Sequence, residues 1–212
     1  ACSAGGTVSL KLGEEKTCTI TNDDIAPTLK LIKKVINDNG GTATPNDFTP
    51  SVDGIAKTWN VAITLAAGNH TVSESNLAGY EASTWSGACS TDGKITLALG
   101  ENKVCTITND DIVPKLKLVK TVVNDNGGTA VVADFTPSID GTASSWNTFV
   151  ALNAGSHTAS ETTVPGYQAS TWGGDCNADG TITLAVGDRK ICTITNNDIA
   201  PTLKLIKTVI ND

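Results

Sequence analysis

The six cysteines are the residues whose type and spacing most directly suggest chemistry. They fall into two series with one spacing of 87 residues (89 − 2 and 176 − 89): Cys2, Cys89 and Cys176, and Cys18, Cys105 and Cys192. Two cysteines per repeat in a chain rich in Thr, Asn, Gly and Asp predict one disulfide per module and an oxidising, extracellular setting. Pairing within a repeat is preferred because each pair flanks a single hairpin. Pairing between repeats, such as Cys18 with Cys89, and buried free thiols stay open as alternatives.

The same offset of 87 residues relates other functional side chains, without insertion or deletion. The related sets are Lys33 with Lys120, Glu74 with Glu161, Trp85 with Trp172, and Asn22 with Asn109 and Asn196. Such self-similarity predicts a string of like modules, each large enough for one small core. We expect complete repeats at 25–111 and 112–198, the last part of a preceding repeat at 1–24, and the first strand of a following repeat at 199–212.

Composition excludes several classes of function. The formal charge is −7, from 15 basic and 22 acidic residues, with no basic run, so binding to a nucleic acid backbone is poorly driven. No apolar stretch approaches the roughly 18 residues that a membrane span needs. A zinc site is not favoured either, because the two histidines come singly per repeat and the cysteines lack close paired spacing.

Short strands bounded by turns must position these residues. Residues 29–35 alternate, with Leu29, Leu31, Lys33 and Val35 on one face, and the dense turn signal 37–41 follows. Further strands are expected at 59–65, with Val61 in phase with Trp59, then at 70–74, 95–99 and 104–109. Without helical periodicity, this pattern predicts an antiparallel-rich sandwich. A junction of about five residues, 110–114, joins the two repeats and favours a semi-rigid rod.

Three short motifs of the first repeat recur in the second, with Ala159 in place of Val72: Leu65-x-x-Gly68-x-His70-x-Val72-x-Glu74, then Gly79-Tyr80, then Thr106-Ile107-Thr108-Asn109. In these motifs the chain resembles the Cna protein B-type, SpaA-like prealbumin-fold repeats of bacterial surface adhesins and pilins. The resemblance implies an all-β fold of tandem immunoglobulin-like (prealbumin-like) β-sandwich repeats, with the first and last strands side by side and parallel. Two features depart from the family: a histidine where tyrosine is common, and a cysteine pair that many members lack.

The resemblance also implies an intramolecular amide between a lysine of the first strand and an asparagine of the last, assisted by an acidic residue. The candidates carried over by motif are Lys33, Glu74 and Asn109, and in the second repeat Lys120, Glu161 and Asn196. Each is in phase with apolar neighbours and should point inward, where burial disfavours the charged forms of lysine and glutamic acid. The alternative is a buried ion pair, with the asparagine capping a turn.

Weaker signals concern metals and ligands. With first and last strands parallel, Asp38, Asp110 and Asp111 would cluster at the junction, with Asp125 at the next one, and their oxygens suit calcium. Solvated turn residues are the favoured explanation. The four tryptophans could form a sugar-stacking surface, but core packing is the more economical use. His70 and His157 are interpreted as structural.

Taken together, the sequence predicts a structural repeat protein of an extracellular filament, adhesin stalk or pilus-like surface fibre, and not an enzyme acting on an external substrate. The expected partners are the chain's own repeats or further filament subunits, with a surface ligand on a host or neighbouring cell as a further partner. Two alternatives stay open: an adhesion module that binds carbohydrate or protein, and a filament subunit assembled by strand donation.

Overall fold

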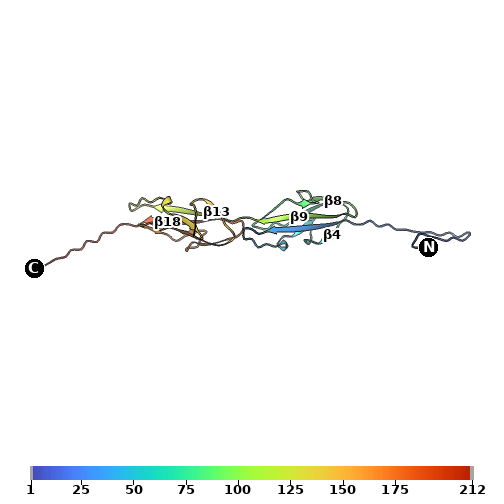
Figure 1. Cartoon of the computed structure of the whole chain (residues 1–212), viewed down its shortest axis with the longest axis horizontal. Helices are drawn as coiled ribbons and strands as arrows, with labels where there is room; N and C mark the ends of the chain where they lie inside the picture. Colours follow the sequence, from blue (N-terminus) through green and yellow to red (C-terminus); the bar gives the residue numbers. More distant parts are fainter. Residues whose placement is uncertain (1, 211–212) are drawn as a thin grey trace.

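The computed structural model describes residues 2–210, which contain two successive β modules with extended segments at opposite ends (Figure 1). The first module comprises β1 (Thr28–Ile36), β2 (Pro50–Val52), β3 (Ile55–Ala56), β4 (Ala62–Thr64), β5 (Gly68–Glu74), β6 (Tyr80–Ala82), β7 (Ser86–Gly87), β8 (Lys94–Leu97) and β9 (Asn102–Asp111). The second comprises β10 (Lys115–Val123), β11 (Pro137–Ile139), β12 (Thr142–Ala143), β13 (Phe149–Ala151), β14 (Gly155–Glu161), β15 (Tyr167–Ala169), β16 (Gly173–Gly174), β17 (Thr181–Leu184) and β18 (Arg189–Asp198).

Each module is a sandwich of two sheets. In the first module one sheet has the strand order β4-β1-β9-β6, with β7 also paired to β9, and the other has the order β3-β2-β5-β8. The first and last strands, β1 and β9, are parallel neighbours over the whole length of β1. The second module repeats this arrangement, with β10 parallel to β18. The predicted all-β fold of tandem prealbumin-like sandwiches is therefore confirmed.

The core of the first module lies between its two sheets. Leu29, Leu31 and Lys33 alternate with more exposed residues along β1, and their side chains are buried because successive residues of a strand face opposite sides. Val72 and Leu97 of the other sheet pack against them. A second cluster, which includes Leu116, Leu118, Ile182 and Leu184, forms an equivalent core in the second module. Each module thus buries its own apolar residues.

The structure corrects the strand predicted at 59–65. Trp59 is buried, but Val61 is 52% exposed, and β4 begins only at Ala62. The alternation fails because Asn60 adopts a positive φ of 63° and donates its backbone N–H to the Leu31 carbonyl, which turns the chain between Trp59 and Val61. Sequence reasoning also missed β2, β3 and the short 3-10 turn Pro45–Asp47, together with their counterparts in the second module.

The two end segments have no strand among their described residues, 2–27 and 199–210. Leu203 and Leu205 are largely exposed, whereas Leu29 and Leu31, which occupy the same positions in the first module, are fully buried. The strand predicted within 199–212 is therefore not formed over 199–210, and residues 211–212 lie outside the described part. Within 2–210, no helix is long and apolar enough to cross a membrane.

Candidate functional site: a buried lysine, glutamate and asparagine

Three strands bring Lys33, Glu74 and Asn109 together inside the first module. Lys33 comes from the middle of β1 and Asn109 from β9 in the same sheet, while Glu74 ends β5 in the facing sheet. Lys33 Nζ donates hydrogen bonds to Glu74 Oε2 and to Asn109 Oδ1. The predicted residues thus meet in one site that spans both sheets.

The second module holds the same arrangement. Lys120 Nζ donates to Glu161 Oε2 and, at 2.5 Å, to Asn196 Oδ1. Two copies with the same partners show that the geometry follows from the module and not from one local sequence. Lys120, Glu161 and Asn196 therefore form a second candidate site.

Both sites are nearly dry. The side chains of Lys33 and Lys120 are 0% exposed and those of Glu74 and Glu161 are 6% exposed. The second carboxyl oxygen of each glutamate, Oε1, is buried with no hydrogen-bond partner among the described residues. A buried oxygen without a partner is costly. Each glutamate therefore has one buried carboxyl oxygen that accepts no hydrogen bond from the described residues.

Aromatic rings complete the surroundings of each lysine, and sequence reasoning missed one of them. Lys33 Nζ lies 3.9 Å from the centre of the Phe48 ring and 5.6 Å from that of Trp59, whose Nε1 donates to the Phe48 carbonyl at 2.7 Å. Lys120 has the same neighbours in Phe135 and Trp146. The recurrence of Phe48 as Phe135 at the repeat offset is the signal that could have identified this ring.

Burial changes the acid–base chemistry of the two lysines. Removal from water lowers the pKa of Lys33 and of Lys120 below the ordinary value of 10.5, although the hydrogen bond and charge of the neighbouring glutamate oppose that change. A lowered pKa increases the fraction of neutral amine. A neutral amine is the form that can act as a nucleophile.

The arrangement decides between some of the earlier alternatives. Asn109 does not cap a turn, because it lies within β9 and pairs with Ala82 of β6 and Val35 of β1. The alternative in which this asparagine caps a turn is therefore wrong. A hydrogen-bonded Lys33–Glu74 pair is present, and it places the amine beside the Asn109 carboxamide. Formation of the amide bond stays a prediction.

The disulfides join cysteines of the same repeat, as Cys2–Cys18, Cys89–Cys105 and Cys176–Cys192. The hairpin that they were expected to flank is not formed, because β8 pairs with β5 while β9 belongs to the other sheet. Cys89 instead follows β7, which pairs directly with β9 at Cys105. Each disulfide of the two modules therefore ties the last strand to a neighbouring segment at one edge of its sheet.

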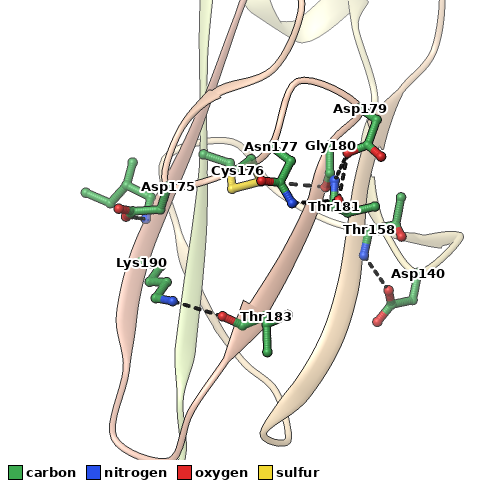
Figure 2. The surroundings of a disulfide bond; sticks show 12 residues. Asp140, Thr158, Asp175, Cys176, Asn177, Asp179, Gly180, Thr181, Thr183 and Lys190 are labelled. Carbon is green, nitrogen blue, oxygen red and sulfur yellow. Dashed lines mark hydrogen bonds between the residues drawn. A yellow bond between two sulfur atoms is a disulfide. The ribbon is translucent and has the colours of Figure 1, made fainter.

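Figure 2 shows the loop around Cys176 in the second module. Asn177 Nδ2 donates to Thr181 Oγ1 at 2.9 Å, and Asp179 Oδ1 accepts bonds from the N–H and the hydroxyl of Thr181. These bonds close the turn before β17. Cys176 therefore lies directly beside an ordered, hydrogen-bonded turn.

The carboxylates expected at the junction do cluster. Oxygens of Asp38, Asp110 and Asp111 lie within 4.8 Å of one another. Asp111 is buried and accepts backbone N–H bonds from Asp38, Asn39 and Gly41, which gives it a structural role without an ion. In the second module Asp125 Oδ1 accepts a hydrogen bond from Asn126 Nδ2. Asn197 stands at the position that corresponds to Asp110, so one carboxylate of the cluster is missing there. Calcium binding stays a prediction.

The tryptophans and histidines have structural partners. Trp59 and Trp85 are buried and stack with ring centres 6.4 Å apart. His70 donates or accepts at both ring nitrogens, with Nδ1 at 2.7 Å from Asp53 Oδ2 and Nε2 at 3.0 Å from the Ala66 carbonyl. His157 makes the equivalent pair of contacts with Asp140 and Asn153. These contacts account for the positions of the tryptophans and histidines without an external ligand.

Comparison with known proteins gives one family and several solved structures. The sequence profile of a family described as a prealbumin-like fold domain matches residues 24–107 and 111–194. The Bacillus anthracis TIE protein has 19% identity and a TM-score of 0.43; the match covers 84% of this chain and 34% of that one, so the chain spans about a third of its length. The major pilin from Streptococcus pyogenes has 11% identity, a TM-score of 0.33, and coverages of 84% and 99%. The C-terminal fragment of pilus adhesin SpaC from Lactobacillus rhamnosus GG has 16% identity, a TM-score of 0.36, and coverages of 85% and 100%. No curated protein sequence matches this chain.

Proposed function

Because the chain belongs to the family of prealbumin-like fold domains, we propose that it is a structural segment of an extracellular surface fibre, adhesin stalk or pilus, in which an amide bond closes each module. The observation that carries this proposal is the contact of Lys33 Nζ with both Asn109 Oδ1 and Glu74 Oε2 in a dry core, repeated in the second module. The role is mechanical, and the chemistry is a single event within each module.

The proposed step balances without any external reagent. The neutral amine of Lys33 attacks Cγ of Asn109, a Cγ–Nζ bond forms, and the bond from Cγ to Nδ2 breaks. The proton released by Nζ passes through the Glu74 carboxyl group to Nδ2, which leaves as ammonia. Lysine amine plus asparagine carboxamide thus gives a secondary amide plus ammonia. The contact of Glu74 Oε2 with Lys33 Nζ places the carboxyl group beside the amine and supports this proton transfer.

Intact mass tests this function. The unmodified chain should be lighter than its sequence mass by one ammonia per module after the disulfides are reduced. The double variant Glu74→Ala/Glu161→Ala should recover the full mass, because it removes the group that transfers the proton. Glu81→Ala, at an exposed position of β6, is the matched control and should keep the deficit. A full mass for the unmodified chain would exclude the amide bond.

The binding-module alternative gains no support from the tryptophans. Trp59 and Trp85 point into the core of the first module, and their counterparts Trp146 and Trp172 pack against the core of the second. Aromatic residues used for sugar binding would need to be exposed on a common face. The tryptophans therefore favour the structural role.

A further inference from the structure

Backbone contacts from separate segments hold the two modules together. Only residues 112–114 separate β9 from β10. Beside this short connection, the Asn39 carbonyl of the first module accepts the N–H of Ala154 of the second at 2.7 Å, and a Cβ placed on Gly187 of the second would lie 3.3 Å from Gly79 Cα of the first. Contacts from separate segments restrict rotation about the connection. A covalent linker without such contacts leaves that rotation freer.

Two glycines allow this close approach. A Cβ placed on Gly79 would lie 2.5 Å from Val186 Cγ2 and 2.8 Å from the Val186 carbonyl oxygen. A Cβ on Gly40 would lie 2.8 Å from both the N and the O of Ala154. These distances are shorter than real Cβ contacts. A larger residue at either position therefore requires the facing segment of the second module to shift.

The equivalent glycines of the second module separate this effect from backbone conformation. Gly40 and Gly127 have φ values of 89° and 92°, and Gly79 and Gly166 have values of 81° and 84°. A Cβ on Gly127 or Gly166 would meet nothing within 4 Å. The backbone strain of replacing glycine by another residue is therefore the same for each glycine and its counterpart in the other module. They differ only in whether a neighbouring module is packed against them.

Exposure follows the same pattern at neighbouring positions, although Gly40 and Gly127 are both exposed. Asn39 and Gly79 are half-buried, whereas their counterparts Asn126 and Gly166 are exposed. On the other side of the junction Val186 is half-buried, whereas its counterpart Leu99 is 55% exposed. An open cleft of about 450 Å³ remains between the modules, lined on its two sides by residues such as Tyr80 and Val186. The junction thus depends on a few close contacts.

We propose that each module carries a docking surface at one end that fits the opposite end of a second copy of the module. The tail surface consists of residues 39–40 and 79, and recurs as residues 126–127 and 166. The head surface consists of residues 154 and 186–187, and recurs as residues 67 and 99–100. Recognition uses backbone amides, backbone carbonyls and the absence of side chains. This inference rests on the proposed role of the modules as segments of a fibre, to which it adds a fixed orientation.

Amide hydrogen exchange in the unmodified chain gives the first test. Ala154 and Ala67 occupy equivalent turns, but Ala154 donates to Asn39, whereas the structure gives the Ala67 amide no hydrogen bond within residues 2–210. The Ala154 amide should exchange at least about tenfold more slowly than the Ala67 amide. Equal exchange rates would overturn the docking surface, whatever the state of the amide bonds inside the modules.

Matched glycine variants give the second test. In Gly40→Ala/Gly79→Ala, residual dipolar couplings should no longer fit one common alignment for both modules, and protection of Ala154 should be lost. In Gly127→Ala/Gly166→Ala, both should stay as in the unmodified chain. Retention of one alignment in the first variant, or its equal loss in both, would refute the proposal. The ammonia deficit relative to each sequence mass, which should be the same in all these proteins, reports separately on the proposed amide bonds.

Discussion

Lys33 and Asn109 are diagonal neighbours on parallel strands. In the register of β1 and β9, Lys33 lies beside Ile107, and Asn109 lies two residues farther on beside Val35, yet Lys33 Nζ reaches Asn109 Oδ1. Side chains two residues apart on a strand share a face, so both enter the core. A bond between them would connect the strand that enters the module to the strand that leaves it. Tension along the chain would then bypass the residues in between.

Single-molecule extension should show this bypass. Under reducing conditions the unmodified modules should not lengthen, because the amide bond carries the force from Lys33 to Asn109. The variant Glu74→Ala/Glu161→Ala should release the 75 residues between these positions (109 − 33 − 1) in each module, up to about 270 Å of chain. Equal lengthening in both proteins would contradict a force path through the amide.

Each module should react independently, because each contains its own complete site. Asn109→Ala removes the carboxamide of the first module and leaves the second site intact. The reduced protein should therefore lose one ammonia instead of two, as measured by intact mass. Asn76→Ala, an exposed position outside the strands, is the control and should still lose two. A loss of both ammonias in Asn109→Ala would show that the assignment of Asn109 is wrong, and a loss of neither would contradict independent reaction of the two modules.

The sequence allowed the inward residues of the site to be predicted because strand alternation is regular there. Lys33 shares a face with Leu29 and Leu31, and burial follows directly. Phe48 could not be placed in this way, because it follows a 3-10 turn and has no periodic neighbours. Asn60 interrupts the alternation through a backbone conformation that periodicity does not reveal. The alternation of apolar and polar residues therefore predicts which side chains of a strand face the core. It does not predict which side chains from loops complete the site.

The contacts between modules are harder still to predict. The bond from Ala154 to Asn39 joins backbone atoms of two loops far apart in the sequence, so no side-chain type marks it. The prediction of a stiff junction rests on the short, proline-containing connection and not on contacts between the modules. The glycines at 40 and 79 look like ordinary turn residues until the neighbouring module is in place.

The disulfide of the first module should contribute to stability. Cys89 and Cys105 are 16 residues apart, and closing a loop of about this size stabilises the folded state by roughly 3 kcal/mol in the loop-entropy model. Cys89→Ser/Cys105→Ser should lower the free energy of unfolding by about that amount in denaturant titrations followed by tryptophan fluorescence. The same change at Cys176 and Cys192 should act on the second module. An unchanged transition would show that strand pairing alone holds this edge.

His70 should titrate above its ordinary pKa of 6.5. The hydrogen bond to Asp53 raises the pKa most, and the Ala66 carbonyl raises it further, while burial opposes the change. The imidazolium thus stabilises the module fully below about pH 6.5, and this contribution is lost as the pH rises through the folded pKa. In NMR titrations, Asp53→Asn should lower the pKa of His70 and leave His157 unchanged. An unshifted His70 in that variant would contradict the pairing.

The carboxylate cluster should cost stability at neutral pH. Desolvation by neighbouring groups raises the pKa of the exposed Asp38 above its ordinary value of 3.8, and the charges of Asp110 and Asp111 raise it further, so ionisation of Asp38 is less favourable in the folded state. Asp110→Asn copies the second module, where Asn197 stands at this position. We expect the variant to lower the pKa of Asp38 in carboxyl NMR titrations and to raise the unfolding midpoint at neutral pH, with the gain vanishing once Asp38 is protonated.

Added calcium separates this repulsion from ion binding. Because Asp111 already accepts backbone N–H groups, calcium should stabilise the unmodified chain no more than the variant. Stabilisation of the unmodified chain alone would show that the three carboxylates bind calcium at the junction.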